Sequence, residues 1–221
     1  MVQKLLLSLA LALALPVEAG ASELGAAFEI VRKGDPIGAH IVDVTPREDG
    51  FDVSTRIAMR VKFGPVTLFR YAHHAVEHWR NGRLERLTST TVEGGKRQDL
   101  TVERVGETFL VDGSAFKGVA PADAIPSSYW NKSILETDRL LNTQTGEIID
   151  VSVADLGVTT APGGAPAQHH RLTGSVSLDL WYDDLRWVGA DFTVRGERLS
   201  YRPIDGEAQR RLTTKMEVGP S

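Results

Sequence analysis

The sequence contains no cysteine, and this absence removes several kinds of chemistry at once. Without thiols there are no disulfides, no thiolate metal ligands, no cysteine nucleophile and no lipid-modified N-terminal cysteine. The sequence also has no excess of basic residues, because its 25 Lys and Arg are outnumbered by 29 Asp and Glu, and the net charge is -4. Such a chain has no overall positive field to attract phosphate backbones, so we expect no nucleic-acid partner.

Long apolar runs are missing as well, apart from one short run near the N-terminus. Residues 5–15 contain only Leu, Ala and one Ser, they follow Lys4, and Pro16 comes directly after them. A membrane-spanning helix needs roughly 20 apolar residues, so this run is too short to span and has the form of a secretory signal. Small residues predict cleavage after Ala19 or Ala21. We therefore expect a periplasmic or secreted mature chain with no transmembrane segment.

Apolar residues alternate with polar ones through much of the mature chain, which indicates β-strands. In residues 51–63 the odd positions hold Phe, Val, Thr, Ile, Met, Val and Phe, and the even positions are mostly polar. Gly64-Pro65 is expected to turn the chain, and Asn81-Gly82, typical of a two-residue hairpin, separates strands expected at residues 66–79 and 84–92. Alternation resumes after Gly146, and two further strands are expected near Tyr201 and Leu212.

The number of predicted strands points to a mainly β fold. We expect ten to twelve strands in a single antiparallel β domain over residues 22–221, in a strongly curved sheet that forms a barrel or half-barrel. One or two short helices should cover this sheet. The capping-box pattern of Ser133 and Glu136, followed by apolar residues, predicts a helix over residues 133–141 that ends at Asn142.

The segment His74-Ala75-Val76-Glu77-His78 matches the H-x-x-E-H pattern of a class of zinc peptidases. That chemistry requires a helix, whereas residues four apart in a strand lie roughly 13 Å from each other. Since the segment ends at a predicted hairpin, we expect His74 and His78 on one face of a strand and Glu77 on the other. No metal or other cofactor is predicted, because the alternative ligands His40 and the His169-His170 pair have no diagnostic spacing.

Two groups of residues remain as candidate sites. The first is a polar group, in which Glu77 with His73 or His74 could transfer protons; it comprises Tyr71, His73, His74, Glu77 and His78. The second is an aromatic group that could form the wall of an apolar ligand-binding pocket, or could simply pack in the core; it comprises Tyr129, Trp130, Trp181, Tyr182 and Trp187.

Three short motifs in this chain resemble those of a known family. Residues 126–131 read Pro-Ser-Ser-Tyr-Trp-Asn, residues 142–147 connect an Asn to Gly-Glu, and residues 180–183 read Leu-Trp-Tyr-Asp. Together they are similar to a domain-of-unknown-function family of exported proteobacterial β-rich proteins. This resemblance implies a fold and carries over no activity. In architecture alone, the expected sheet with its helical cover also resembles periplasmic lipoprotein carriers, which enclose an apolar cavity.

These observations favour a non-catalytic protein of the cell envelope that binds a hydrophobic or lipid-like molecule. One alternative is an interaction or structural protein of the envelope that has no ligand cavity, whose partner would be another envelope protein. The other is an unrecognised enzyme that depends on the His and Glu residues of the polar group. The oligomeric state is not indicated by the sequence.

Overall fold

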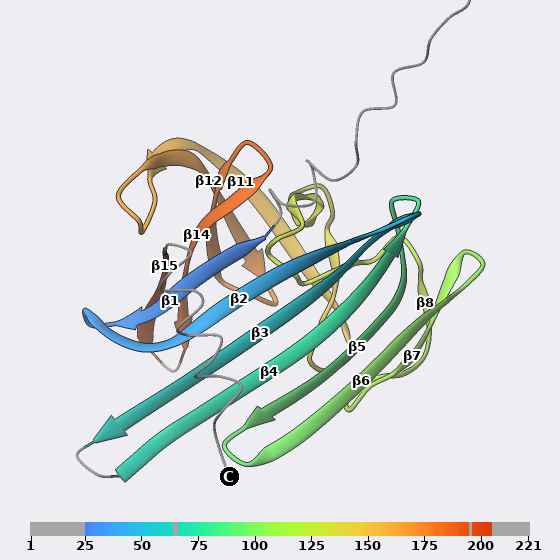
Figure 1. Ribbon diagram of the computed structural model, residues 1–221, viewed down its shortest axis with the longest axis horizontal. Coiled ribbons are helices and arrows are strands. Elements are labelled where there is room, and N and C mark those ends of the chain that lie inside the picture. Colours follow the sequence, from blue (N-terminus) through green and yellow to red (C-terminus); the bar gives the residue numbers. More distant parts are fainter. Residues whose placement is uncertain (1–24, 64–65, 195, 205–221) are drawn as a thin grey trace, which may run out of the picture.

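The computed structural model describes residues 25–63, 66–194 and 196–204, and all of its long elements are β-strands (Figure 1). The first eight strands are β1 (Ala26–Arg32), β2 (Asp35–Arg47), β3 (Gly50–Phe63), β4 (Val66–Arg80), β5 (Arg83–Glu93), β6 (Lys96–Val105), β7 (Thr108–Asp112) and β8 (Lys117–Pro121). The remaining seven are β9 (Ile125–Pro126), β10 (Arg139–Leu141), β11 (Ile148–Thr160), β12 (Pro166–Gly174), β13 (Leu178–Asp183), β14 (Arg186–Val194) and β15 (Glu197–Pro203). The expected secretory signal, the Gly64-Pro65 turn and the strand near Leu212 lie outside the described residues.

The strands form one 15-stranded sheet in the order β8-β7-β6-β5-β4-β3-β2-β1-β15-β14-β13-β12-β11-β10-β9. Neighbours are antiparallel, except that β9 and β10 run parallel. Antiparallel neighbours follow from short connections such as Asn81-Gly82, where both residues have positive φ, 49° and 74°. The expected mainly β, antiparallel fold is therefore confirmed, with more strands than the ten to twelve that the sequence predicts.

The sheet curls until its two edges come close together. Its edge strands, β8 and β9, are consecutive in the chain, and only residues 122–124 separate Pro121 from Ile125. Four extended residues span at most about 14 Å, so the end of β8 and the start of β9 lie within that distance, although no ladder joins these two strands among the described residues. The molecule is a barrel-like sheet that is not closed.

One large core fills the concave side of this sheet. Along β3 the predicted alternation is confirmed, because Val53, Thr55 and Met59 are buried while Arg60 is exposed. The core continues over the inner faces of β4 to β6 and of β13 to β15. A second, small cluster of Ala161, Ala167 and Trp181, with Val188 against it, is separate from the main core.

The helix expected over residues 133–141 does not form, and this prediction is wrong. The segment contains only a four-residue 3-10 turn, η1 (Lys132–Leu135), followed by the short strand β10. Asn131, not Ser133, caps the turn, because its side chain accepts a hydrogen bond from the Ser133 backbone N–H. The backbone of Leu140 and Leu141 is instead paired with β9 and β11. In the part of the chain that the structure describes, no helix is long and apolar enough to cross a membrane.

Candidate functional site

A pocket of about 260 Å³ opens on the concave side of the sheet. Strands β2, β3 and β4 supply one wall, β14 and β15 supply another, and the connections that follow β9 and β10 close the pocket. Its lining combines apolar and uncharged polar side chains with one carboxyl at Glu93. The lining residues are His40, Thr55, Ile57, Met59, Phe69, Tyr71, His73, Ala75, Glu93, Ser127, Ser128, Tyr129, Thr143, Gln144, Phe192, Val194, Leu199 and Tyr201.

Strand register brings the polar residues of the pocket together. His40 on β2 is opposite Ile57 on β3, Ile57 is opposite His73 on β4, and His73 is opposite Thr91 on β5. Side chains directly opposite each other in an antiparallel sheet point to the same face, so these four form one row across the inner surface. Within the row, the His73 Nδ1 and Thr91 Oγ1 atoms are 2.8 Å apart.

His40 lies deep in the pocket and is surrounded by rings. The centroid of its imidazole is 5.0 Å from that of Trp187 and 5.4 Å from that of Tyr201. Its side chain is 4% exposed, and its Nδ1 atom has no hydrogen-bond partner among the described residues. The hydroxyl of Thr55, which is also buried, likewise has no partner there. Two buried polar atoms on adjacent strands thus lack a partner within the described structure, and both belong to residues that line one cavity.

Burial keeps the titratable groups around His40 uncharged. Desolvation, followed by repulsion from His73, lowers the pKa of His40 to about 3. Desolvation likewise lowers the pKa of His73 to about 4. It raises the pKa of Tyr129 to about 12 and raises those of Tyr71 and Tyr201 as well. At neutral pH the deep end of the pocket therefore offers neutral imidazoles and protonated phenols.

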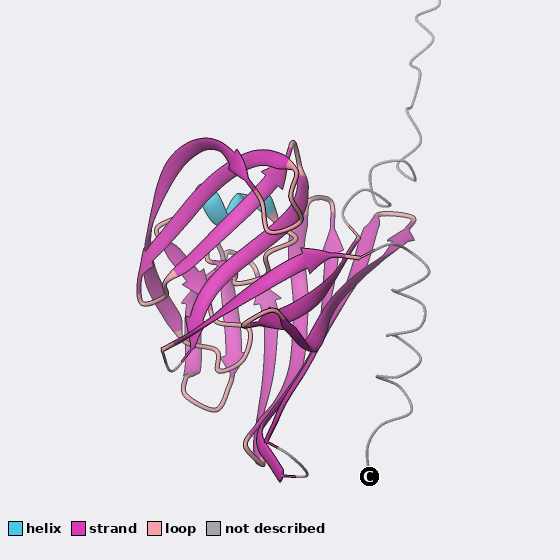
Figure 2. Cartoon of the chain, turned by 90° about the vertical axis from the view of Figure 1, so that its left-hand side faces the viewer, coloured by secondary structure: helices cyan, strands magenta, loops and turns pink. Residues whose placement is uncertain are grey.

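Residues 127–135, here called the strap, cross the interior beside this pocket, and Figure 2 shows their short helical turn within the curve of the strands. On the β4 side, the Glu77 carboxylate accepts hydrogen bonds from the strap residues Ser128 and Trp130. On the β13 side, the Tyr182 hydroxyl donates to the Tyr129 carbonyl at 2.7 Å. The strap is consequently tied to two strands that lie six positions apart in the sheet order.

Glu77 is buried to 1% exposure and does not pair with a histidine in the described structure. Besides the strap donors, it accepts a hydrogen bond from Trp79 Nε1 at 2.8 Å, while the Trp130 bond measures 3.4 Å. Burial raises the pKa of Glu77, although its three hydrogen bonds oppose this shift. The geometry gives Glu77 an anchoring role, and it does not assemble the proton-transfer pair with His73 or His74.

The predicted polar group is divided between the two faces of β4. Tyr71 and His73 line the pocket and Glu77 lies beside it, whereas His74 and His78 point to the outer face. This division follows from the strand, in which successive side chains point to opposite sides. The expectation that the H-x-x-E-H segment is extended is confirmed, since Val66–Arg80 is a single strand.

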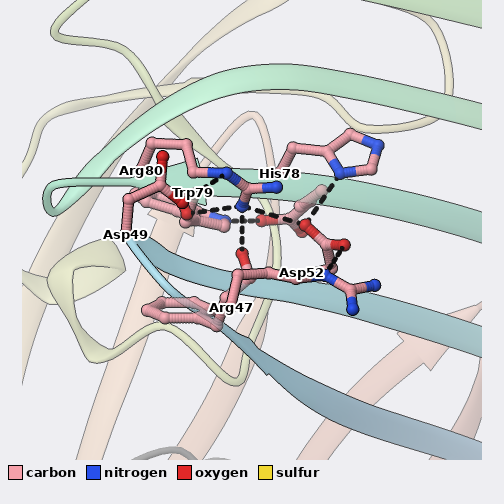
Figure 3. Close-up of polar contacts among 8 residues, drawn as sticks. Arg47, Asp49, Asp52, His78, Trp79 and Arg80 are labelled. Atoms are coloured by element: carbon pink, nitrogen blue, oxygen red, sulfur yellow. Dashed lines mark hydrogen bonds and ion pairs between the residues drawn. The ribbon is translucent and has the colours of Figure 1, made fainter. Parts of the chain in front are cut away.

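On the outer face, His78 belongs to a charged network at the ends of β2, β3 and β4 (Figure 3). The Asp52 carboxylate is 2.8 Å from His78 Nδ1, 2.7 Å from Arg47 Nε and 3.0 Å from Arg80 Nη1. Partial burial of Asp52 opposes ionisation, but these three hydrogen bonds outweigh it and lower its pKa to about 2. Asp49 also pairs with Arg80. The network holds neighbouring strand ends together.

The predicted aromatic group is only partly gathered at the pocket. Tyr129 lines it, and Trp187 packs against Tyr129 and His40. Trp130, within the strap, and Tyr182, on β13, are buried in the main core.

Trp181 does not belong with this group, because it is adjacent to Tyr182 in β13 and therefore faces the opposite side of the sheet. There its ring stacks on that of His169, with the two ring centroids 4.2 Å apart, and its Nε1 donates a hydrogen bond to Thr159 Oγ1 at 2.8 Å.

Most of the pocket lining is absent from the candidate groups that the sequence indicates, and three of these residues matter most for its polar end: His40, Thr55 and Tyr201. A signal for Thr55 was present, because it is the one polar residue at the odd positions of the strand at residues 51–63. A buried hydroxyl on an otherwise apolar strand face is costly unless it is hydrogen-bonded, so it indicates either a partner in the protein or a bound ligand. His40 and Tyr201 gave no such signal, since only strand pairing places them near Thr55.

Comparison with known proteins gives the same fold. A family model described as "Domain of unknown function (DUF6134)" matches residues 28–204. A solved structure from Brucella abortus, described as a beta-barrel-like protein of domain of unknown function DUF1849, superposes with a TM-score of 0.59 at 6% sequence identity. That match covers 82% of this chain and 95% of the other, and at such low identity it shows the fold alone. No curated protein matches the sequence.

Proposed function

The chain belongs to the family described as a domain of unknown function (DUF6134), and we propose that it is a binding protein for a small, largely apolar molecule. The observation that carries this proposal is the pocket between the curled sheet and the strap. Its walls are mainly aliphatic and aromatic, and the remaining lining residues, apart from Glu93, are uncharged polar residues. Concave sites of this composition are the usual form of small-molecule sites in proteins.

The size of the pocket sets the size of the ligand. Its volume of about 260 Å³ is just below the roughly 300–1,000 Å³ of typical small-molecule pockets. At roughly 30 Å³ for each water-sized group, about nine non-hydrogen atoms fit. The occupant is thus a small molecule, or the end of a longer chain that extends past half-buried residues such as Phe69 and Gln144.

The strap supports this proposal because it gives the pocket a fixed roof. Ser128 and Tyr129 line the pocket, and both belong to the segment held by Glu77 and Tyr182. A pocket that is largely formed before binding loses less free energy in ordering its own side chains. We place the protein in the periplasm or outside the cell, on the strength of the N-terminal signal pattern, where it would bind its ligand in solution.

The proposal is tested by filling the pocket. Ile57→Trp adds bulk between His40 and His73, and Val158→Trp adds the same side chain at an exposed position of β11 as a matched control. Each protein is purified after export, analysed by native mass spectrometry, and extracted with organic solvent for mass spectrometry of the extract.

A small apolar molecule retained by the wild type and by Val158→Trp, and lost from folded Ile57→Trp, is the expected result. Equal recovery from all three proteins, or none from any, would contradict the proposal. In the latter case the envelope-interaction alternative becomes the better account.

A further inference from the structure

Two residues that line the pocket each carry a buried polar atom without a hydrogen-bond partner among the described residues. His40 Nδ1 and Thr55 Oγ1 are both buried and lack hydrogen-bond partners in the described part of the chain. In the register of β2 and β3, His40 is opposite Ile57 and Val42 is opposite Thr55, so His40 and Thr55 are diagonal neighbours on the inner face. Diagonal positions of an antiparallel pair are about 7–8 Å apart, close enough for both side chains to contact one small group.

A buried polar atom without a partner destabilises a protein, because it has lost its hydrogen bonds to water and gained none in return. Two such atoms in residues that line the same cavity are therefore expected to receive a partner from the molecule that fills it. An imidazole nitrogen and a threonine hydroxyl together can accept one hydrogen bond and donate another. A ligand hydroxyl can also donate one hydrogen bond and accept another, so a single hydroxyl can bond to both side chains.

The charges around the cavity indicate what kind of group this is. Among the lining residues there is no Lys or Arg, and Glu93 at the half-buried end of β5 is the one carboxylate. His73 and the three tyrosines that line the pocket are uncharged at neutral pH. An anionic head would find no cation in this lining, and a cationic head at the deep end would lie among neutral groups. Burying an unpaired charge is much more costly than burying a neutral polar group.

We infer that the polar end of the ligand is an uncharged hydrogen-bonding group, of the kind an alcohol carries, held between the His40 imidazole and the Thr55 hydroxyl. This inference rests on the proposed function and adds the chemical class of the ligand to it. The apolar part of the molecule then lies along Ile57, Met59 and Leu199.

A matched series of six-carbon compounds tests the inference: hexan-1-ol, hexanoate, hexylammonium and hexane, each titrated by calorimetry at neutral pH. These molecules fit within the pocket volume and differ only in the head group. Thr55→Val removes one hydroxyl from the pocket with little change in shape. Thr193→Val makes the same change at an exposed position of β14 and is the control.

We expect hexan-1-ol to bind at least about tenfold more tightly than hexanoate or hexylammonium. Thr55→Val should weaken hexan-1-ol binding roughly three- to tenfold, as expected for loss of one neutral hydrogen bond, and leave hexane binding unchanged. Thr193→Val should change neither.

Tighter binding of a charged probe, or an equal effect of Thr55→Val on hexan-1-ol and hexane, overturns the inference and leaves the proposed function in place. If none of the four compounds binds the wild type, the proposed function itself fails. These two failures are therefore distinguishable within one set of titrations.

Discussion

Removal of the Glu77 carboxylate should destabilise the protein strongly. Glu77 is buried and accepts hydrogen bonds from Trp79, Ser128 and Trp130. Glu77→Leu fills a similar volume but leaves these three donors without an acceptor. Glu77→Gln keeps one acceptor oxygen and replaces the other with a donor.

The size of the effect follows from the number of unsatisfied donors. Each buried donor left without a partner costs about 1–3 kcal/mol, and the 3.4 Å bond from Trp130 is the weakest of the three. Glu77→Leu should therefore lower the free energy of unfolding by about 3 kcal/mol or more, and Glu77→Gln by about 1–3 kcal/mol. Glu103→Gln, at an exposed pair with Arg86, should cost less than about 1 kcal/mol and serves as the control.

The pH dependence of this loss gives a second readout. Burial raises the pKa of Glu77 above its ordinary value of 4.5, so the folded chain holds this proton to higher pH than the unfolded chain does. The stabilisation that comes from this bound proton is therefore fully present below pH 4.5, and it declines as pH rises through the pKa of Glu77 in the folded protein. Because Gln does not titrate, the stability difference between wild type and Glu77→Gln should shrink as pH rises above 4.5.

Urea unfolding of the wild type and the three variants, followed by tryptophan fluorescence across this pH range, measures both quantities. A Glu77→Leu loss below about 1 kcal/mol would refute the anchoring role, since even one unsatisfied donor costs that much. A difference for Glu77→Gln that grows with pH would refute the reasoning about burial.

Three further results are expected. His40 has a folded pKa of about 3, below its ordinary 6.5, so the unfolded chain binds its proton first and stability falls as pH drops through this window. His40→Phe should make the slope of the free energy of unfolding against pH shallower by up to about 1.4 kcal/mol per pH unit, as measured by urea unfolding. An unchanged slope would count against a buried neutral imidazole. Gly146→Ala should destabilise by at least about 1 kcal/mol more than Gly82→Ala. Both glycines have positive φ, but a Cβ at Gly146 meets Val111 Cγ1 at 2.8 Å, whereas nothing lies within 4 Å at Gly82; equal losses in the same assay would show that the contact relaxes freely. Mass spectrometry of the exported protein should find a mature N-terminus at Gly20 or Ser22, and an intact residue 1 in the cytoplasm would contradict export.

The β character of the fold could be predicted from the sequence because it depends on local alternation. Residues 51–63 alternate over their whole length, and the structure forms Gly50–Phe63 as one strand. The Asn81-Gly82 turn was equally readable, since both residues tolerate the positive φ that a two-residue hairpin requires. The sequence does not indicate strands β8, β9 and β10, because they have only two to five residues and do not alternate between apolar and polar side chains.

The wrong helix at residues 133–141 shows where local patterns are insufficient. Ile134, Leu135, Leu140 and Leu141 have a spacing that a helix would also explain, and the capping box added to that signal. In the structure, Leu140 pairs with Ile149 on β11 and with Ile125 on β9, so tertiary pairing outweighs helix propensity.

The pocket could not be assembled from the sequence for a similar reason. His40, Thr55 and Tyr201 lie on three different strands, and their proximity depends on the register of β2 with β3 and on the pairing of β1 with β15. A shift of one residue in any of these ladders would turn the side chains to the outer face.

A crystal structure of the protein grown with hexan-1-ol would test the binding site most directly. We expect density for the alcohol between the sheet and the strap, with its oxygen within hydrogen-bond distance of His40 Nδ1 and Thr55 Oγ1. A cavity filled only by water or by rearranged side chains, with the alcohol bound elsewhere or not at all, would contradict it.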